Sequence, residues 1–407
     1  MTMTKEERVL RVIRGQDVDY LPSQITFSDR TRDAEISKAL GLASPDDLDG
    51  YLENHLCIAL SGHDKPLFYR NDKAEMERLK AKGFCGPDWD RHTVYDSWGM
   101  GIQVGSYGFF ACFHPLRKKA TPEMAAHMPP DVNREVLFQD IDDAVRNYRV
   151  PDITRPGLFD EMARDLRDQS GSALVIPSGY FGIYERGYGL MGFGEFMTNM
   201  AVKPKVVHEL LDKITDYRVA YARKVVEMGF KVAHHGDDLG TQQGTLFSRQ
   251  MFREFVLPRL KRAWQPYNDA GIPIILHSCG CLIDFLPDLI EIGLRVLEPV
   301  QPCMDLARLK REFGKDLIFW GGIDTQTFLP FGTPEQVKQM ARETIRTLGK
   351  GGGHIIGPSQ EVMNDVPIAN VKALVETIVE QRQTVLSRGP AAAPSAATWG
   401  NCRRVWA

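Results

Sequence analysis

The sequence has 407 residues, of which 43% are hydrophobic, and its formal net charge is −3. This is enough apolar material for one large core, and α/β barrels often exceed about 250 residues as a single domain. The charges are mixed along the chain without a basic cluster, which argues against a nucleic-acid-binding protein. No segment approaches the ~18 consecutive apolar residues of a membrane span, so we expect no association with a membrane.

The seven cysteines are scattered along the chain and odd in number, which argues against a disulfide framework. The amino terminus has charged residues where a signal peptide would have an apolar stretch. Together these features predict a cytoplasmic protein in a reducing environment. Free thiolates are then available as metal ligands.

The first third of the chain is irregular. Residues 4–15 predict a short helix that ends at Gly15. Residues 16–150 contain clusters of proline, glycine and aspartate, and we interpret residues 1–150 as an N-terminal cap or barrel insertion. The low-complexity segment 387–407 predicts a flexible tail, which leaves residues 1–386 as a single domain.

From about residue 170 onward, short apolar runs alternate with long amphipathic segments. The runs predict strands at 173–177, 230–233, 272–276, 294–297, 317–320 and 354–356. The segments between and after them predict helices at 204–228, 249–270, 281–292, 334–349 and 367–385. Repeated strand–helix units indicate a parallel sheet, and six of them favour a TIM (β/α)₈ barrel. Polar residues follow the strands, where a barrel places its chemistry.

The sharpest candidate site is His277 with Cys279, directly after a predicted strand. Imidazole nitrogen and thiolate sulfur are ligands that zinc prefers, and the His-x-Cys spacing lets both side chains point the same way. The alternative is a buried histidine beside a structural thiol. Two ligands are half of a tetrahedral site, so further donors must come from other strand ends.

A second candidate is the carboxylate pair Asp237 and Asp238, preceded by His234 and His235. Two carboxylates after a strand suit metal binding, proton transfer or binding of a polar substrate. The alternative is that one carboxylate caps a helix and the other is solvated. Because strand side chains alternate between faces, we expect at most one of the two histidines to point into the barrel.

Further candidates are predicted to contact substrate. Gln301 and Asp324 each follow an apolar run, for which simple turn chemistry is the alternative. Tyr180, Phe181 and Trp320 are candidates for the wall of an aromatic pocket, for which ordinary core packing is the alternative. The glycines at 349–353 precede a strand and lack the ending of a phosphate loop, so they predict a turn.

Six segments, in order, resemble the uroporphyrinogen decarboxylase superfamily. They lie at 236–242, 252–258, 277–280, 299–301, 321–324 and 365–370, and the opening helix with residues 96–99 extends the likeness. The resemblance implies a TIM barrel. True decarboxylases of this superfamily bind their acidic tetrapyrrole through paired arginines, which are absent at residues 21–30 here.

The other branch of this superfamily comprises methyltransferases that exchange a methyl group with a cobalamin-bearing protein. His277 and Cys279 match the zinc ligands of that branch, but residues 357–361 lack the late cysteine that serves as the third ligand. The resemblance leaves Glu361, Asp237, Asp238 and Cys303 as alternatives for the third donor. A zinc ion with fewer thiolates is a stronger Lewis acid and suits an oxygen substrate.

The resemblance therefore predicts a zinc-assisted methyltransferase that moves a methyl group from a small methylated substrate, such as an aryl methyl ether, to a corrinoid. The sequence has no corrinoid-ligand motif, so the cobalamin is expected on a partner protein. A homodimer is an open alternative. Other functions remain open: the second-step transfer to tetrahydrofolate or a thiol, a decarboxylase-like lyase, and a non-catalytic tetrapyrrole-binding protein.

Overall fold

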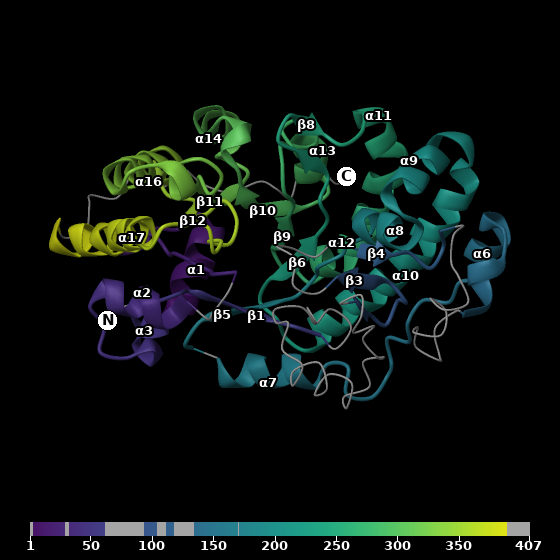
Figure 1. Cartoon of the computed structure of the whole chain (residues 1–407), viewed down its shortest axis with the longest axis horizontal. Helices are drawn as coiled ribbons and strands as arrows, with labels where there is room; N and C mark the ends of the chain where they lie inside the picture. Colours follow the sequence, from purple (N-terminus) through teal and green to yellow (C-terminus); the bar gives the residue numbers. More distant parts are fainter. Residues whose placement is uncertain are drawn as a thin grey trace.

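Parallel strands form the centre of the protein, between two groups of helices (Figure 1). The computed structural model describes residues 3–28, 32–61, 93–103, 111–117, 134–169 and 171–388. The strands of the ring are β1 (Leu56–Ala59), β5 (Leu174–Pro177), β6 (Ala233–Gly236), β9 (Ile274–His277), β10 (Leu294–Val300), β11 (Ile318–Ile323) and β12 (His354–Pro358). β6, β9, β10, β11 and β12 pair in that order, and β1 pairs with β5.

The ring closes through two further contacts. After β5, the carbonyl of Gly179 accepts a hydrogen bond from the Gly236 amide at 2.9 Å, which joins β5 to β6. Residues 22–27 act as the remaining strand, because Ser23 bridges Ile356 of β12 in parallel and its carbonyl accepts the His55 amide ahead of β1 at 3.1 Å. All neighbours in the ring follow chain order, so the predicted TIM barrel is confirmed.

Helices surround the ring and alternate with its strands. Their bounds are α1 (Lys5–Ile13), α2 (Asp33–Leu40), α3 (Leu48–Leu52), α8 (Tyr184–Met191), α9 (Phe193–Val202), α10 (Pro204–Glu227), α11 (Arg249–Met251), α12 (Leu257–Asp269), α13 (Leu286–Glu291), α14 (Leu306–Phe313), α15 (Phe328–Phe331), α16 (Pro334–Gly349) and α17 (Ile368–Arg388). Residues 252–256 form a π-helical turn between α11 and α12. Figure 1 shows α14, α16 and α17 on one side of the strands and α8, α9 and α10 on the other. Among the residues that the structure describes, no helix has the length and apolar character to span a membrane.

Most predicted elements are confirmed within a few residues, but the strand expected at 230–233 is wrong. β6 begins at Ala233 and runs to Gly236, because its register pairs Ala233 with Ile274 and Gly236 with His277 of β9. Phe230 belongs to the hydrophobic core instead. His234 and His235 both lie inside β6.

A long insertion separates β1 from β5. Its described parts are the antiparallel strands β2 (Thr93–Tyr95), β3 (Gly101–Gln103) and β4 (Ala111–Phe113), the turn 134–138, α6 (Ile141–Asn147) and α7 (Asp160–Asp168). A buried ion pair between Arg186 of α8 and Asp96, 2.5 Å long, ties the insertion to the barrel. Because residues 22–59 supply barrel strands, the predicted cap begins after β1. The predicted cap also includes residues 29–31, 62–92, 104–110 and 118–133, which lie outside the described residues, as do residues 389–407 of the predicted tail.

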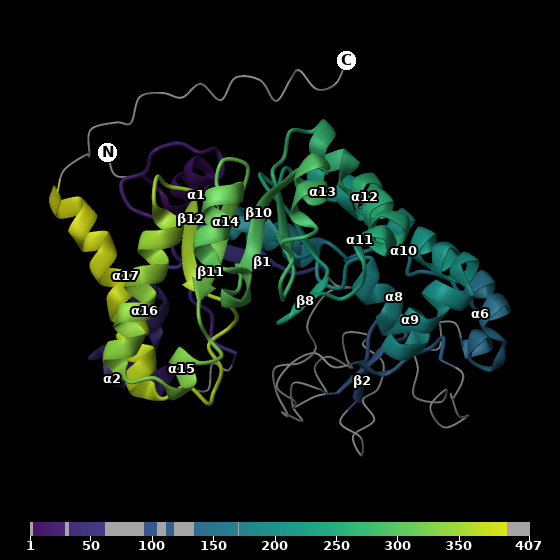
Figure 2. The ribbon, with the colours of Figure 1, turned by 90° about the horizontal axis from the view of Figure 1, so that it is seen from above.

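Side chains that point into the barrel alternate with those that point outward. Val232, Ile275, Val296, Ile318 and Ile355 form one inner core cluster, together with the apolar face of α1. Figure 2 shows α1 at one end of the strands, with α8, α9, α15 and β8 (Gly244–Thr245) toward the opposite end. The amino-terminal end of the barrel is therefore filled by α1, and the carboxyl-terminal end is left for chemistry.

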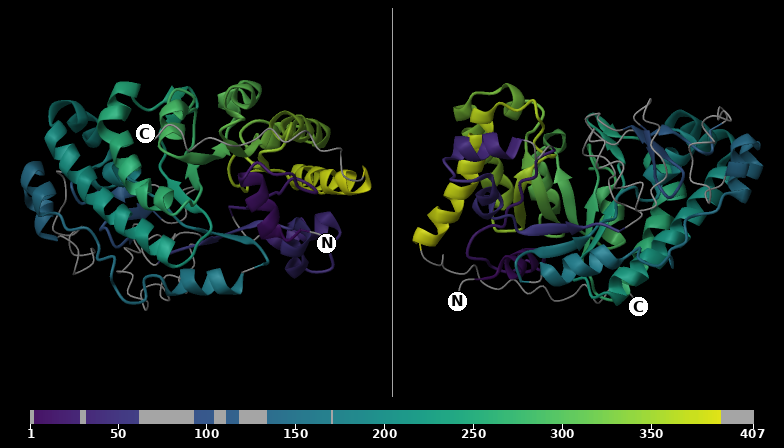
Figure 3. Two further views of the ribbon diagram at one scale, coloured as in Figure 1. Left: turned by 180° about the vertical axis from the view of Figure 1, so that it is seen from behind. Right: turned by 60° about the horizontal axis from the view of Figure 1, so that its bottom comes forward.

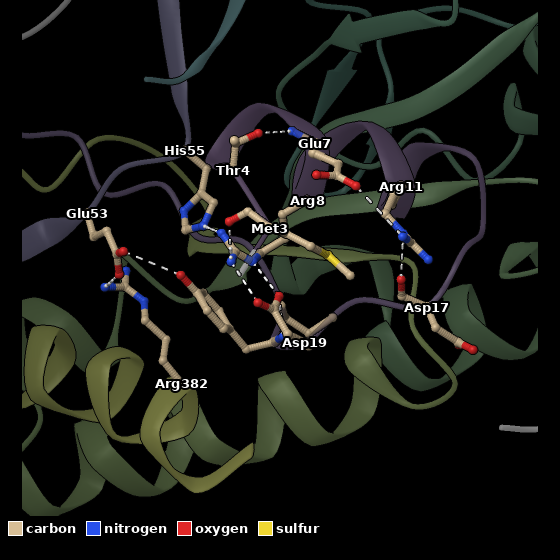
Figure 4. A network of polar contacts seen from close by, with 12 residues as sticks. Met3, Thr4, Glu7, Arg8, Arg11, Asp17, Asp19, Glu53, His55 and Arg382 are labelled. Atoms are coloured by element: carbon tan, nitrogen blue, oxygen red, sulfur yellow. Dashed lines mark hydrogen bonds and ion pairs between the residues drawn. The ribbon is translucent and has the colours of Figure 1, made fainter. Parts of the chain in front are cut away.

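A polar network joins α1, the start of β1 and α17 at the end of the barrel that α1 fills (Figure 4). Arg8 forms a two-pronged ion pair with Asp19 and places a third nitrogen 3.2 Å from Nε2 of His55. Arg382 donates to Ser23 and, at 3.1 Å, to Glu53. Figure 3 shows the purple N-terminal helices beside the yellow α17. The network therefore fastens the two ends of the barrel sequence together.

Burial and the nearby positive charges of Arg8 and Arg382 lower the pKa of His55 to about 3. His55 is thus neutral in the folded protein, whereas the unfolded chain takes up a proton below pH ~6.5. We predict that stability falls between pH ~6.5 and pH ~3 by up to about 1.4 kcal/mol per pH unit from this group. His55→Asn should flatten the pH dependence of urea unfolding, whereas Gln339→Met, at an exposed position of α16, should leave it unchanged. Equal slopes in all three proteins would contradict the prediction.

Candidate metal site at the mouth of the barrel

The alternation of inward side chains explains why three polar residues converge at the carboxyl-terminal end. Val232, Ile275 and Val296 point into the barrel. Val232 directly precedes β6, and Ile275 and Val296 lie in β9 and β10; two residues after each of them, the inward positions are His234, His277 and Glu298. These three side chains offer ligand atoms that all lie within 4.8 Å of one another. The site is therefore the last inward layer of three neighbouring strands.

His277 lies at the centre of the site. Its Nδ1 lies 2.7 Å from Oε2 of Glu298, and this hydrogen bond turns Nε2 toward the mouth. There Nε2 lies 3.9 Å from Sγ of Cys279 and 3.8 Å from Oδ1 of Asp238. The ligand atoms of a tetrahedral zinc are separated by roughly 3.5 Å, so small side-chain movements would place all three around one ion. Histidine, cysteine and aspartate are a donor set that fits zinc.

Glu298 also reaches His234, whose Nε2 lies 3.9 Å from Oε2. Nδ1 of His234 accepts a hydrogen bond from the Gly179 amide at 3.1 Å. Although burial opposes the charge, Glu298 raises the pKa of His277 well above its ordinary value. Burial alone would raise the pKa of Glu298, but His277 and His234 lower it to about 2. A carboxylate that orients a histidine in this way is typical of the surroundings of a zinc ligand.

Asp237 has a different environment from its neighbour. Its carboxylate is fully buried and accepts the backbone amides of Ile183, Tyr184 and Glu185 at 2.7–3.0 Å. These amides form the first turn of α8, whose positive end favours a negative charge. Oδ2 also lies 3.4 Å from Nε2 of His235, which points away from the barrel interior. The geometry therefore favours the helix-capping interpretation for Asp237.

Asp238 faces the candidate metal ligands. Its side chain is 35% exposed, and Oδ1 accepts the backbone amide of Cys279 at 2.8 Å. This hydrogen bond fixes the carboxylate beside the cysteine while the second oxygen keeps its capacity to bind. Of the four alternatives for the third donor, Asp238 is the one that the described geometry groups with His277 and Cys279.

Gln301 links two loops of the site. Its Oε1 accepts the Gly280 amide at 2.9 Å and its Nε2 donates to the Ser359 carbonyl at 3.1 Å. Gly280 has φ +88°, and a Cβ there would lie 2.4 Å from the backbone of Gly240. Only glycine fits between Cys279 and Cys281 in this turn. The sequence predicted that Gln301 binds substrate, but both the oxygen and the nitrogen of its side chain bind backbone groups.

The aromatic candidates are not brought together. Tyr180 lies against both histidines, with ring centroids 5.5 Å from His234 and 6.0 Å from His277. The ring of Phe181 lies 4.9 Å from the guanidinium of Arg186. Trp320 is buried in the inner core cluster with Ile318 and Ile355. Tyr180 is thus the aromatic candidate that borders the site.

Two other predicted residues are placed at the edge of the site. Asp324 accepts the amides of Gln326 and Thr327 at 2.7 and 3.1 Å, which is turn chemistry after β11. Glu361 follows β12, and its negative charge contributes to the raised pKa of Tyr180 after burial and Glu298. Within the described ranges, neither Glu361 nor Cys303 belongs to a group of ligand atoms within 4.8 Å.

Sequence reasoning missed several residues of the site. Glu298 could have been found from the alternation in its strand, which places it on the same face as Val296. Glu185 lies at the start of α8 and accepts a hydrogen bond from Tyr188 at 3.3 Å. Burial, with the negative charges of Asp238 and Asp237, raises the pKa of Glu185. Gln360, whose amide lies 3.5 Å from the sulfur of Cys279, has no signal in the sequence.

Fold and site together define a TIM-barrel protein with a candidate metal site at the carboxyl ends of its strands. The chain belongs to the uroporphyrinogen decarboxylase (URO-D) family, whose model matches residues 123–381. The resemblance predicted from the sequence motifs is confirmed at this level.

Similar proteins include two kinds of enzyme. A methylated-thiol–coenzyme M methyltransferase of Methanosarcina mazei is 30% identical over 181 residues, which cover 44% of this chain and 45% of the relative. A methylcobamide:CoM methyltransferase of Methanosarcina acetivorans is 23% identical, covering 92% and 97%. A uroporphyrinogen decarboxylase of Chlorobaculum tepidum is 25% identical, covering 71% and 77%. A solved methyltransferase from Methanosarcina mazei has the same fold, with a TM-score of 0.57 at 18% identity over 93% of this chain and 99% of that one.

We predict that the protein binds about one zinc ion per chain and that His277→Ala or Cys279→Ala abolishes this binding. Glu298→Gln should weaken zinc binding by roughly 10–100-fold, because it loosens the hydrogen bond that orients His277. Metal analysis after gel filtration, with a competing chelator for the affinity, measures both effects. Full zinc occupancy in Cys279→Ala would refute the ligand assignment.

The two neighbouring aspartates should differ in their effect on stability. Asp237→Asn replaces one acceptor oxygen by a donor that faces backbone amides, which should cost about 3 kcal/mol of unfolding free energy. Asp238→Asn keeps an acceptor for the Cys279 amide and should cost less than about 1 kcal/mol. Urea unfolding of the two variants makes the comparison. Equal losses would mean that the capping role assigned to Asp237 is wrong.

Proposed function

We propose that this protein is a corrinoid-dependent methyltransferase that removes a methyl group from a small methylated substrate, most simply an aryl methyl ether. The acceptor is the Co(I) corrinoid of a partner protein. The observation that carries the proposal is the convergence of His277, Cys279 and Asp238 at the open end of the barrel, with one sulfur among the three donors. The names of the methyltransferase relatives support methyl transfer that involves a corrinoid.

A bound zinc would supply Lewis acidity to the ether oxygen, which is otherwise a poor leaving group. His277 and Cys279 would hold the ion, and the hydrogen bond to Glu298 keeps the His277 ring in one orientation. Asp238 would complete the donor set, or its carboxyl group would give a proton to the oxygen that leaves the methyl group. Tyr180 packs against the two histidines and forms an apolar border that keeps water from that side of the substrate.

A second candidate is the transfer of a methyl group from the corrinoid to a thiol. It is favoured by the relatives, since the one from Methanosarcina mazei is named for methylated thiols and coenzyme M. The two candidates share the fold, the metal and the partner. They differ in which heteroatom lies beside the metal, and a single sulfur ligand favours oxygen because the metal keeps more Lewis acidity.

The experiment mixes the protein with Co(I) corrinoid protein and a panel of methoxylated aromatics, and follows the corrinoid absorbance for methylation. We predict methylation of the corrinoid with at least one ether. Asp238→Asn should slow it by roughly 10²–10⁴-fold if the carboxylate handles the proton. Surface residue Gln339, exposed on α16, provides a control substitution to methionine. If no ether reacts but methylated corrinoid is consumed by a thiol or tetrahydrofolate, the second candidate is correct.

The same protein should not convert uroporphyrinogen. Residues 21–30 lack the paired arginines expected for a substrate with many carboxylates, and the two groups of candidate ligands contain no arginine or lysine among the described residues. Burying such a substrate without cations would cost several kcal/mol. Detection of coproporphyrinogen by chromatography after incubation would overturn this prediction and support a decarboxylase-like lyase.

A further inference from the structure

We propose that Gln360 is a specificity-determining residue of the candidate metal site. Its side-chain amide donates a hydrogen bond to the sulfur of Cys279 and so limits the electron density that this sulfur gives to a bound metal. The inference rests on the proposed function only for the presence of a metal at His277 and Cys279. It adds a reason why the site would prefer an oxygen group to a thiol.

The first observation is the contact itself. Nε2 of Gln360 lies 3.5 Å from Sγ of Cys279, within hydrogen-bonding distance for the large sulfur atom. The orientation of the amide is fixed by its other end, because Oε1 accepts the backbone amide of Glu361 at 3.0 Å. A backbone N–H can only donate, so the oxygen must face Glu361 and the NH₂ group must face the sulfur.

Gln301 links the two loops that carry Gln360 and Cys279. Gln301 is buried, with 5% of its surface exposed, and it bonds to Gly280 after Cys279 and to Ser359 before Gln360. The amide of Ser359 also donates to the Ile323 carbonyl at 2.7 Å. The loops that carry the sulfur and the amide are therefore fixed relative to one another, although Gln360 itself is exposed.

The third observation concerns the donor set. Cys279 contributes the one sulfur in the group of ligand atoms formed with His277 and Asp238 among the described residues. An N–H donor on a thiolate withdraws charge from the sulfur, and hydrogen bonds to a ligand tune the metal that it binds. With one weakened thiolate, the metal keeps a high Lewis acidity. That favours polarising an ether oxygen over binding a thiol.

Cobalt(II) in place of zinc gives a direct readout, because thiolate-to-cobalt charge transfer absorbs in the near ultraviolet and its energy follows the electron density on sulfur. Gln360→Met has a similar length but no donor, and its band should move to lower energy. Gln360→Lys keeps an N–H donor, and its band should stay at the parent energy or move higher. Gln339→Met on α16 is the matched control and should leave the band unchanged.

The preference between ligands is the second readout. Titration of the cobalt protein with a phenol and with a small alkanethiol gives two dissociation constants. Their ratio should shift toward the thiol by roughly tenfold in Gln360→Met, the size of effect that hydrogen bonds around metal ligands produce. An unchanged ratio overturns the specificity role.

The outcomes separate this inference from the proposed function, since neither readout needs a corrinoid, an ether or turnover. If the parent protein shows no charge-transfer band, the metal site fails and this inference fails with it. If the parent band is present but Gln360→Met does not move it, the inference alone is wrong. An equal shift in Gln339→Met also overturns it, because the shift would then not report the contact with sulfur.

Discussion

The parallel contact between residues 22–27 and β12 is the constraint on which the rest of the structure depends. This contact converts a row of strands into a closed barrel. Ser23 lies at its centre, because Ser23 bridges Ile356 and accepts hydrogen bonds from Arg382 and from the His55 amide. Closure forces inward side chains of neighbouring strands into common layers. The lower layers are apolar, and the last layer holds His234, His277 and Glu298. β6, β9 and β10 pair directly, which brings His234, His277 and Glu298 together, and closure turns these side chains toward the axis of the barrel.

The electrostatics of the site follow from this layering. His277 and Glu298 share one hydrogen bond in a buried place, where each charge would be costly alone. Their attraction lowers the pKa of Glu298 to about 2 in spite of its burial. A histidine held by a carboxylate through Nδ1 presents Nε2 to a metal in a single orientation. Asp237 contributes in a different way, because its carboxylate anchors the start of α8, whereas Asp238 faces His277 and Cys279.

Sequence patterns predicted the barrel, most of its later strands and the pairing of His277 with Cys279. They succeeded there because period-two burial and helical spacing are local properties of the chain. They failed for β6, where an apolar run at 230–233 precedes the strand and the register with β9 decides its position. They also could not separate Asp237 from Asp238, since the amides that bind Asp237 come from residues 183–185, more than fifty positions earlier. Glu298 follows from the alternation of side chains in its strand, but Gln360 contacts Cys279 from 81 positions away, which no spacing rule records.

The double hydrogen bond of Gln301 has a consequence for how this barrel can change over evolutionary time. Its side-chain oxygen accepts the amide of Gly280, in the loop after β9, and its nitrogen donates to the carbonyl of Ser359, in the loop after β12. An insertion or deletion in the loop after β9 would therefore misplace the loop after β12 as well, unless a compensating change arose there. The two loops should vary in length together, while the turns at the amino-terminal end of the barrel remain free to lengthen independently. The single buried amide of Gln301 thus couples the lengths of two loops that are far apart in sequence.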